Sequence, residues 1–147
     1  MWTTYKLNRS VYYSCQYDVV WCSKYRKKVL KKGIAERLKQ IIVDICEERK
    51  SNLIKIRCAG DHVRILVEVS PQYGIHRLVK QIKRVSAGLL REEFPFLKGI
   101  LPSLWTNNYF VSTVGRVSLG VIEQYIQSQP TRYEEVKAKG WNNDGRL

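Results

Sequence analysis

Residues 53–69 read LIKIRCAGDHVRILVEV, and this stretch decides the fold. Apolar and polar residues alternate on both sides of Gly60-Asp61, which is the pattern of half-buried strands. Gly60-Asp61 is typical of a tight turn, so the stretch predicts an antiparallel hairpin with strands over 53–58 and 62–69. Alternation places four valine and isoleucine residues on one face of the second strand, and the other face carries His62, Arg64, Leu66 and Glu68. This polar face is unusual for a strand.

The segments on both sides of the hairpin have the periodicity of further helices and strands. Before it, residues 13–21 alternate as a strand does, and residues 33–50 carry apolar residues at helical spacing. After it we expect a helix over 75–93, a strand over 104–114 and a short helix from Ser118 to Gln129, capped by Ser118. The order βαββαβ plus a C-terminal helix predicts an α+β fold of the ferredoxin-like type, shared with RNA-recognition domains. In this fold an antiparallel sheet has helices on one face and a free second face.

Length and charge limit the classes of protein. The 147 residues suffice for one domain, which we place at 1–130, followed by a polar tail at 131–147. The net charge of +13 favours a polyanion, above all nucleic acid, as partner. No apolar run approaches the roughly 18 residues of a membrane span, and Met1–Ser10 lacks the apolar core of a secretory signal. The sequence therefore predicts a cytoplasmic protein with no membrane partner.

Two small groups of residues carry chemistry that could form a site. His62 can project from the strand as a metal ligand, but Arg64, two residues on, cannot ligate a metal. A lone strand histidine is more often structural. On the last predicted helix, Tyr125 and Gln129 share a face because they are four residues apart, so a hydroxyl and an amide oxygen can point toward one site. Tyr125 can equally form the edge of that helix's apolar stripe.

A basic and aromatic loop follows the first predicted strand. It comprises Lys24, Tyr25, Arg26, Lys27 and Lys28. The predicted helix over 75–93 adds an outer cationic face with Arg77, Lys80, Lys83, Arg84 and Arg91. Lys and Arg neutralise phosphates, and an aromatic ring can stack on unpaired bases, so the set suits single-stranded or hairpin nucleic acid. Such a run of charges is also common on a merely solvated face.

Four segments in order carry a resemblance to a known family. They are VWCSKYRKKVL at 20–30, DHVRILVE at 61–68, LWTNNYFVSTVG at 104–115 and YIQSQ at 125–129. Together they resemble the HUH single-tyrosine transposases, small proteins that move insertion sequences as single-stranded DNA. The resemblance implies a DNA strand transferase in which the hydroxyl of Tyr125 attacks a DNA phosphate, forming a 5′-phosphotyrosine and freeing a 3′-OH. The covalent link keeps the energy of the broken bond, so no nucleotide cofactor is needed.

The resemblance also implies a metal ion and a dimer. In the family a divalent ion, Mg²⁺ or Mn²⁺, is held by two histidines and a glutamine that follows the tyrosine, so His62 and Gln129 carry over and Arg64 does not. Such an ion polarises the scissile phosphate. The family also forms homodimers that exchange the tyrosine helix. We therefore expect a homodimer in which His62 and the partner subunit's Tyr125 share an active site, with residues 115–120 as a glycine-flanked hinge.

Arg64 leaves three alternatives open. In the first, Asp61 or Glu68 completes an altered metal site, with Asp61 favoured because it adjoins His62 and carboxylate oxygens suit Mg²⁺ and Mn²⁺. In the second, Arg64 itself binds the DNA phosphate through its forked donors. In the third, the protein is a non-catalytic module that binds single-stranded or hairpin nucleic acid without cutting it.

Overall fold

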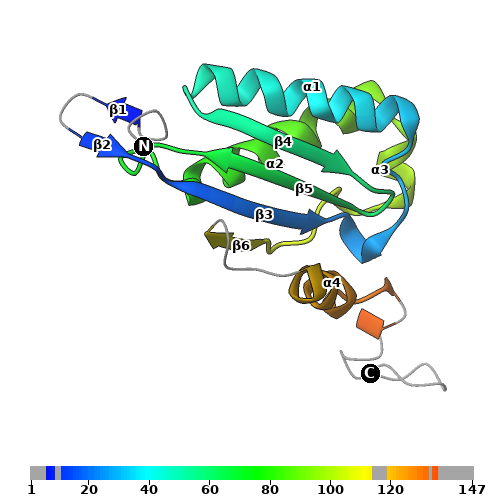
Figure 1. The fold of residues 1–147 in the computed structure, drawn as a ribbon. Helices are drawn as coiled ribbons and strands as arrows, with labels where there is room; N and C mark the ends of the chain where they lie inside the picture. The colour runs from blue at the N-terminus through cyan, green and yellow to red at the C-terminus, as the bar shows by residue number, and fades with distance from the viewer. Residues whose placement is uncertain (1–5, 9–10, 114–118, 133, 136–147) are drawn as a thin grey trace.

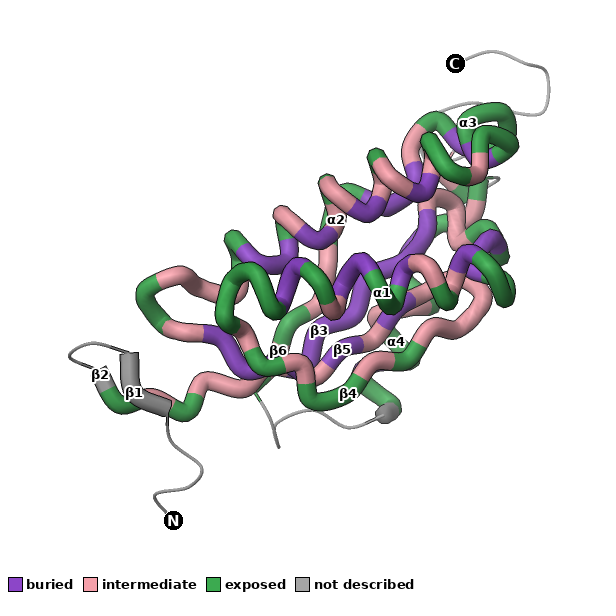
Figure 2. Tube along the Cα trace, turned by 90° about the horizontal axis from the view of Figure 1, so that it is seen from above, coloured by how far each residue is buried: buried purple, intermediate pink, exposed green. Residues whose placement is uncertain are grey.

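A four-stranded antiparallel sheet forms the centre of the molecule (Figure 1). The computed structural model describes residues 6–8, 11–113, 119–132 and 134–135, and the strand order is β4-β5-β3-β6. The strands are β3 (Gln16–Cys22), β4 (Asn52–Cys58), β5 (His62–Glu68) and β6 (Phe110–Thr113). Two long helices, α1 (Lys32–Glu48) and α2 (Ile75–Glu93), lie side by side on one face of the sheet, as Figure 2 shows from above. This arrangement confirms the predicted α+β fold.

The core lies between these two helices and the sheet. Alternation sends Val63, Ile65 and Val67 of β5 toward the helices, and all three are fully buried, as the sequence predicts. Burying one such side chain stabilises the fold by roughly 1.5–3 kcal/mol. Trp21 of β3 packs edge-on against Trp105, with ring centroids 5.9 Å apart. This packing fixes β3 and β5, the two strands whose opposite face carries the polar residues.

The strand pairing shows which residues share the face away from α1 and α2. Directly paired residues point to the same side of a sheet. In the pairing of β3 with β5, Cys22 lies opposite His62 and Val20 lies opposite Arg64. In the pairing of β4 with β5, Arg57 lies opposite Arg64. The second face is therefore polar along β5, as predicted, and the charge continues onto β4.

Helix α4 (Leu119–Ser128) corrects the expectation that the second face is free. It lies on the side of the sheet opposite α1 (Figure 1) and contacts β3. Val20 and Cys22, which point to this side, are completely buried. The helix thus covers the part of the face near the end of β3, whereas Arg57 on β4 stays exposed.

Several predicted boundaries are wrong. The strand expected over 104–114 is limited to β6, because Trp105 turns into the core and its Nε1 donates a hydrogen bond to Ser86 Oγ at 3.0 Å. The strand expected over 13–21 is divided: β2 (Val11–Tyr13) pairs with β1 (Lys6–Asn8), and β3 begins separately. The sequence reasoning also missed two short elements, the 3-10 turn η2 (Lys24–Arg26) and the helix α3 (Phe96–Ile100).

Some expectations concern residues outside the described part of the chain. Ser118, expected to cap the last helix, lies there, as do residues 115–117 of the expected hinge and residues 136–147 of the polar tail. The boundary between domain and tail at residue 130 remains a prediction. In the described part, no helix has both the length and the apolar character needed to span a membrane.

Candidate active site

Tyr125 on α4 faces the sheet. Its ring centroid lies 5.6 Å from that of Phe110 on β6, and its hydroxyl donates a hydrogen bond of 2.7 Å to Oδ1 of Asn108. Burial, and secondarily the neighbouring Cys22, raise the pKa of Tyr125 above its usual value. The hydroxyl is therefore neutral near pH 7 and must lose its proton before it can act as a nucleophile.

Asn108 belongs to a loop that is held from the helix side of the sheet. The ammonium group of Lys83 on α2 donates to the carbonyl oxygens of Thr106 and Asn108, at 2.7 and 2.8 Å. The backbone N–H of Thr106 donates to the carbonyl oxygen of Cys22 at 3.1 Å, which ties the loop to the end of β3. Burial lowers the pKa of Lys83 to about 8. Lys83 is thus half-buried against this loop, which corrects its predicted place on the outer cationic face of α2.

His62 and Asp61 form the second part of the site, at the start of β5. Nδ1 of His62 lies 2.8 Å from Oδ1 of Asp61. The turn that carries them is fixed by Ser23, whose backbone N–H donates to the carbonyl oxygen of Asp61 at 3.0 Å. Because the carboxylate of Asp61 forms a hydrogen bond with Nδ1, Nε2 of the imidazole remains available to bind a ligand. His62 pairs with Cys22, and Tyr125 packs on Phe110, which pairs with Val20, so both parts lie toward the same end of β3.

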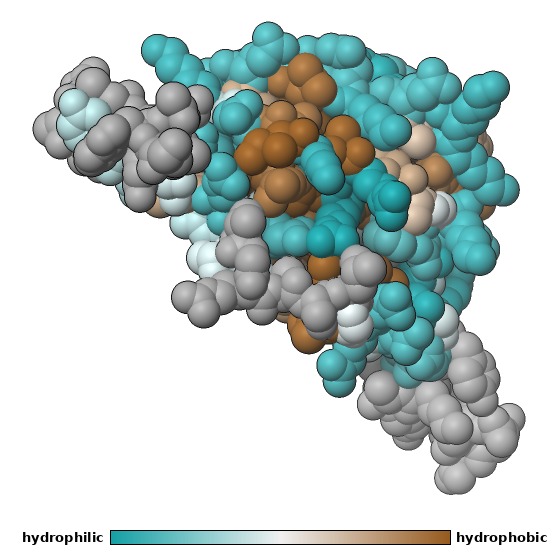
Figure 3. Space-filling model, viewed as in Figure 1, coloured by the Kyte–Doolittle hydropathy of each residue, from teal (hydrophilic) through white to brown (hydrophobic). Residues whose placement is uncertain are grey.

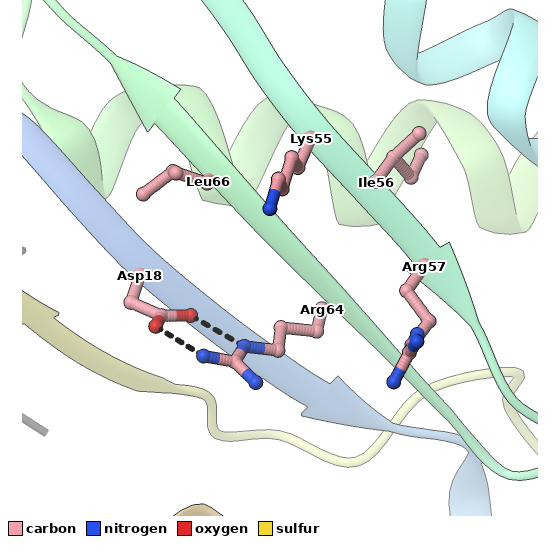
Figure 4. A pocket seen from close by; sticks show the side chains of 6 residues that line it. All are labelled: Asp18, Lys55, Ile56, Arg57, Arg64 and Leu66. Carbon is pink, nitrogen blue, oxygen red and sulfur yellow. Dashed lines mark hydrogen bonds and ion pairs between the residues drawn. The ribbon is translucent and has the colours of Figure 1, made fainter. Parts of the chain in front are cut away.

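Arg64 forms an ion pair that the sequence does not predict. Its Nε and Nη2 donate to the two carboxylate oxygens of Asp18 at 2.9 and 2.7 Å (Figure 4). Asp18 on β3 is buried, and its hydrogen bonds hold the pKa of Arg64 above the ordinary value. The charge of Arg64 is therefore balanced, and its guanidinium is turned toward β3.

Gln129 follows Tyr125 by one helical turn and is buried. Its Nε2 donates to the carbonyl oxygen of Tyr125 at 3.3 Å and to Ser128 Oγ at 3.2 Å, so the amide closes the end of α4. These bonds use the amide's donors and leave its oxygen as an acceptor. Within the described residues, no hydrogen bond joins Gln129 to His62.

The basic loop starts with η2, beside the turn that carries Asp61. Two cationic groups lie over the ring of Tyr25: Nζ of Lys24 is 5.2 Å from the ring centroid, and Cζ of Arg132 is 5.7 Å from it. Tyr25 has a φ of 60°, a left-handed conformation that residues other than glycine rarely adopt. Nε of Arg26 lies 3.9 Å from Oδ2 of Asp61, so the loop brings positive charge to the His62 turn.

The donors around His62 suit a hard divalent cation. A metal-binding histidine typically has a carboxylate or carbonyl on its second ring nitrogen, which is the arrangement of His62 and Asp61. The described residues contain no group of three or more His, Cys, Asp and Glu side chains that could hold a metal. An imidazole nitrogen, a carboxylate oxygen and an amide oxygen are donor types that fit Mg²⁺ or Mn²⁺, and here the carboxylate of Asp61 already bonds to Nδ1 of His62.

Comparison with known proteins relates this site to a family. The family model described as "Transposase IS200 like" matches residues 11–129. The chain belongs to this transposase family. The transposase is 35% identical over 126 residues to the ISDra2 transposase TnpA of Deinococcus radiodurans, across 84% of this chain and 90% of that protein. It is 27% identical over 119 residues to the transposase of IS200 from Salmonella typhimurium, across 80% of this chain and 78% of that protein.

Solved structures agree with this assignment. The crystal structure of a transposase from Deinococcus radiodurans R1 matches with a TM-score of 0.79 and 34% identity, over 86% of this chain and 98% of that chain. A REP-associated tyrosine transposase bound to a REP hairpin matches with a TM-score of 0.52 and 10% identity, over 93% and 75% of the two chains, and so shares the fold. The protein is thus a DNA transposase of the insertion-sequence type, and the family and fold predicted from the sequence are confirmed.

Sequence reasoning missed three residues that position the site. Asp18 could have been predicted, because strand alternation places it on the same polar face as Arg64, which lies on the neighbouring strand β5. Lys83 and Asn108 offered no such signal, since they meet only when α2 and the loop before β6 pack together.

Proposed function

We propose that the transposase cleaves and rejoins single-stranded ends of an insertion sequence through a covalent bond to Tyr125. The hydroxyl oxygen of Tyr125 gives up its proton and attacks the scissile phosphorus. The bond from phosphorus to the 3′ oxygen breaks, and that oxygen takes up a proton. The products are a 5′-phosphotyrosine and a free 3′-OH. The 3′-OH of another end then attacks the phosphotyrosine, which forms a new phosphodiester and returns the tyrosine hydroxyl.

The placement of Tyr125 carries this proposal. Its hydroxyl is held by Asn108 on the same sheet face as His62, and its ring packs on Phe110, which pairs with β3 two residues before the partner of His62. A nucleophile that is held in one orientation avoids part of the entropic cost of reaction. This position agrees with the role that the family resemblance gives to Tyr125.

His62 and Gln129 are the residues that would hold the divalent ion, Mg²⁺ or Mn²⁺, whereas Asp61, predicted as a further ligand, bonds to Nδ1 and would support His62 from the other side of the ring. When bound, such an ion supplies charge neutralisation at the scissile phosphate. Asp61 orients the imidazole through Nδ1, and the packing of α4 holds Gln129 one turn beyond the nucleophile. The pairing of Arg64 with Asp18 reduces the repulsion that an unpaired guanidinium would exert on a cation.

The DNA in this proposal is a single strand or a hairpin, and the basic loop is its main contact. Lys27 and Lys28 are exposed, and the ring of Tyr25 is only partly buried. Lys24 and Arg26 lie beside them, and Arg64, whose charge is balanced by Asp18, offers its Nη1 donors further along β5. Cationic groups around an aromatic ring suit phosphates flanking an unpaired base. We place this activity in the cytoplasm.

The working unit in this proposal is a homodimer with shared active sites. In the single chain, α4 packs on its own sheet through the contact between Tyr125 and Phe110. In the exchange that the family resemblance implies, α4 leaves its own sheet and makes the same contact on the sheet of the partner subunit. Each active site then combines His62 with the partner subunit's Tyr125. Such an exchange is a common route to a dimer.

A non-catalytic binding module is the alternative, and the pair between Arg64 and Asp18 favours it because this pair occupies the place of a second histidine ligand. A suicide-substrate gel separates the two functions. The proposal predicts a protein band shifted by covalently bound DNA in the parent and no such band in Tyr125→Phe. Salt-sensitive DNA binding without any covalent band in the parent would instead support the module.

A further inference from the structure

A hollow on the second face of the sheet extends from the pair of Arg64 and Asp18 onto β4, where no residue has been given a role above. It has a volume of about 650 Å³ and is lined by Asp18, Lys55, Ile56, Arg57, Arg64 and Leu66 (Figure 4). Its lining comes from three neighbouring strands, β3, β4 and β5. Figure 3 shows an apolar area bordered by polar residues on the side of the molecule seen in Figure 1. The hollow therefore combines the apolar side chain of Leu66 with a charged rim.

The charges around this hollow are unbalanced. Asp18 is bound to Arg64 through both carboxylate oxygens. Lys55 and Arg57 are exposed, and neither makes an ion pair or a side-chain hydrogen bond within the described residues. After the pair is subtracted, two positive charges remain at the hollow. An anionic ligand would be attracted here.

Stability of the sheet does not explain this arrangement. Arg57 and Arg64 lie directly opposite each other on β4 and β5, where a carboxylate in place of Arg57 would stabilise the sheet more, even though Asp18 balances the charge of Arg64. A register shift between Leu53 and Lys55 also interrupts the ladder near the hollow. Features that cost stability but gather positive charge are better explained by a ligand than by the fold.

The position of the hollow identifies the ligand. Arg64 lies two residues beyond His62 on the same face of β5, which is a separation of roughly 7 Å along the strand. A DNA strand with its scissile phosphate between His62 and Tyr125 can therefore place a neighbouring phosphate at the hollow. The apolar side chain of Leu66 suits the sugars and bases of an unpaired strand, whereas the cations suit its phosphates.

We propose that this hollow binds the phosphate backbone of the single-stranded DNA next to the cleaved phosphodiester, with Lys55 and Arg57 as the phosphate contacts. This inference rests on the proposed function for the identity of the strand. It assigns β4, which none of the sequence motifs includes, to the DNA-binding surface. Arg64, held rigid by Asp18, presents its remaining Nη1 donors beside them.

The test compares two double variants that remove equal charge. Lys55→Gln/Arg57→Gln changes the hollow, and Lys32→Gln/Lys39→Gln changes exposed lysines of α1 on the other side of the sheet. Fluorescence anisotropy measures binding of a single-stranded oligonucleotide that spans the cleavage position. We expect the hollow variant to weaken binding at least tenfold and to reduce the salt slope by about 1.4, because each single-strand phosphate contact contributes about 0.7. The α1 variant should stay within about twofold of the parent.

A second measurement shows whether the contact is direct. Single methylphosphonates remove the charge of one phosphate at a time from the oligonucleotide. At the phosphate bound by the hollow, this change should weaken binding to the parent but not to Lys55→Gln/Arg57→Gln. Equal weakening by the two double variants, or additive effects at every phosphate, would overturn the proposal. The anisotropy measurement reports binding and does not require cleavage. If the parent binds the oligonucleotide as expected but forms no covalent adduct, that result counts against the proposed function and not against the hollow.

Discussion

The hydroxyl of Tyr125 donates a hydrogen bond of 2.7 Å to the amide oxygen of Asn108. The carbonyl oxygen of the same Asn108 accepts a hydrogen bond of 2.8 Å from Lys83, which reaches it from the helix on the other face of the sheet. One loop residue therefore connects the candidate nucleophile to the packed core. The position of Tyr125 depends on α2 and the loop as well as on α4.

Replacing Asn108 by Ala tests this connection. The hydroxyl of Tyr125 loses its acceptor, and one hydrogen bond of this kind contributes about 1 kcal/mol. We expect the rate of covalent adduct formation to fall about 3- to 10-fold while the DNA affinity stays unchanged. Asn107→Ala, at the exposed neighbouring residue, is the matched control and should keep the parent rate. Equal rates for the two variants would show that Asn108 does not position Tyr125.

Lys83 gives the protein a characteristic dependence of stability on pH. Its pKa is about 8 in the folded protein against an ordinary 10.5, so between pH 8 and 9 the unfolded chain binds more protons at this residue. Lys83 by itself therefore raises the free energy of unfolding over this interval, by about 0.5–1 kcal/mol after allowance for screening by solvent.

Urea unfolding of the parent and of Lys83→Met at pH 8 and pH 9 measures this effect. The free energy of unfolding of the parent, measured relative to that of Lys83→Met, should rise by this amount. The comparison with the variant is needed because Cys22 and Cys46, whose burial raises their pKa from 9.0 to about 11, lower the free energy of unfolding of both proteins over the same interval. An unchanged difference between the two proteins would contradict the assignment to Lys83.

The hairpin over β4 and β5 could be predicted from the sequence because its signals are local. Alternation within residues 53–69 determines which side chains face the helices, and burial of Val63, Ile65 and Val67 follows from it. The same alternation places His62 and Arg64 together on the second face. The resemblance of four segments, in the same order, predicted the transposase family, and the match over residues 11–129 confirms it.

What the sequence did not predict depends on contacts between distant segments. The residues before β6 have high strand propensity, but Trp105 packs against Trp21 and bonds to Ser86, and this tertiary packing prevents a longer strand. Lys83 looks like one more surface cation of α2, and only the folded loop shows the carbonyl oxygens that it binds. The partner of Arg64 was missed although strand alternation places Asp18 on the same face, because the pairing of β3 with β5 joins residues that are 46 positions apart in the chain.

Arg64→His is expected to restore a second imidazole at the metal site. We predict that Mn²⁺ binds to this variant at least tenfold more tightly than to the parent, as measured by calorimetry. The substitution leaves the buried carboxylate of Asp18 unpaired, so the free energy of unfolding should fall by about 1–3 kcal/mol and should recover in Arg64→His/Asp18→Asn. His62→Ala/Arg64→His is the control and should lose the gain. Tighter Mn²⁺ binding by the parent would contradict this account of the site.

Mixed dimers test whether the active sites are shared between protomers. His62→Ala and Tyr125→Phe should each be inactive alone. A dimer with exchanged helices retains one site with both residues intact when the two variants are mixed, so we expect partial recovery of adduct formation. The control is Tyr125→Phe alone, taken through the same procedure for exchanging subunits, and it should stay inactive. If verified heterodimers stay inactive while the parent is active, both residues act from one chain.

The most direct test of the central claim is to locate the DNA on the protein. A suicide oligonucleotide would be incubated with the parent transposase and a divalent ion, and the trapped adduct digested and sequenced by mass spectrometry. The account predicts one modified peptide, which carries the phosphodiester remnant on the hydroxyl oxygen of Tyr125. A remnant on another residue, such as Tyr109 or Tyr133, would contradict it.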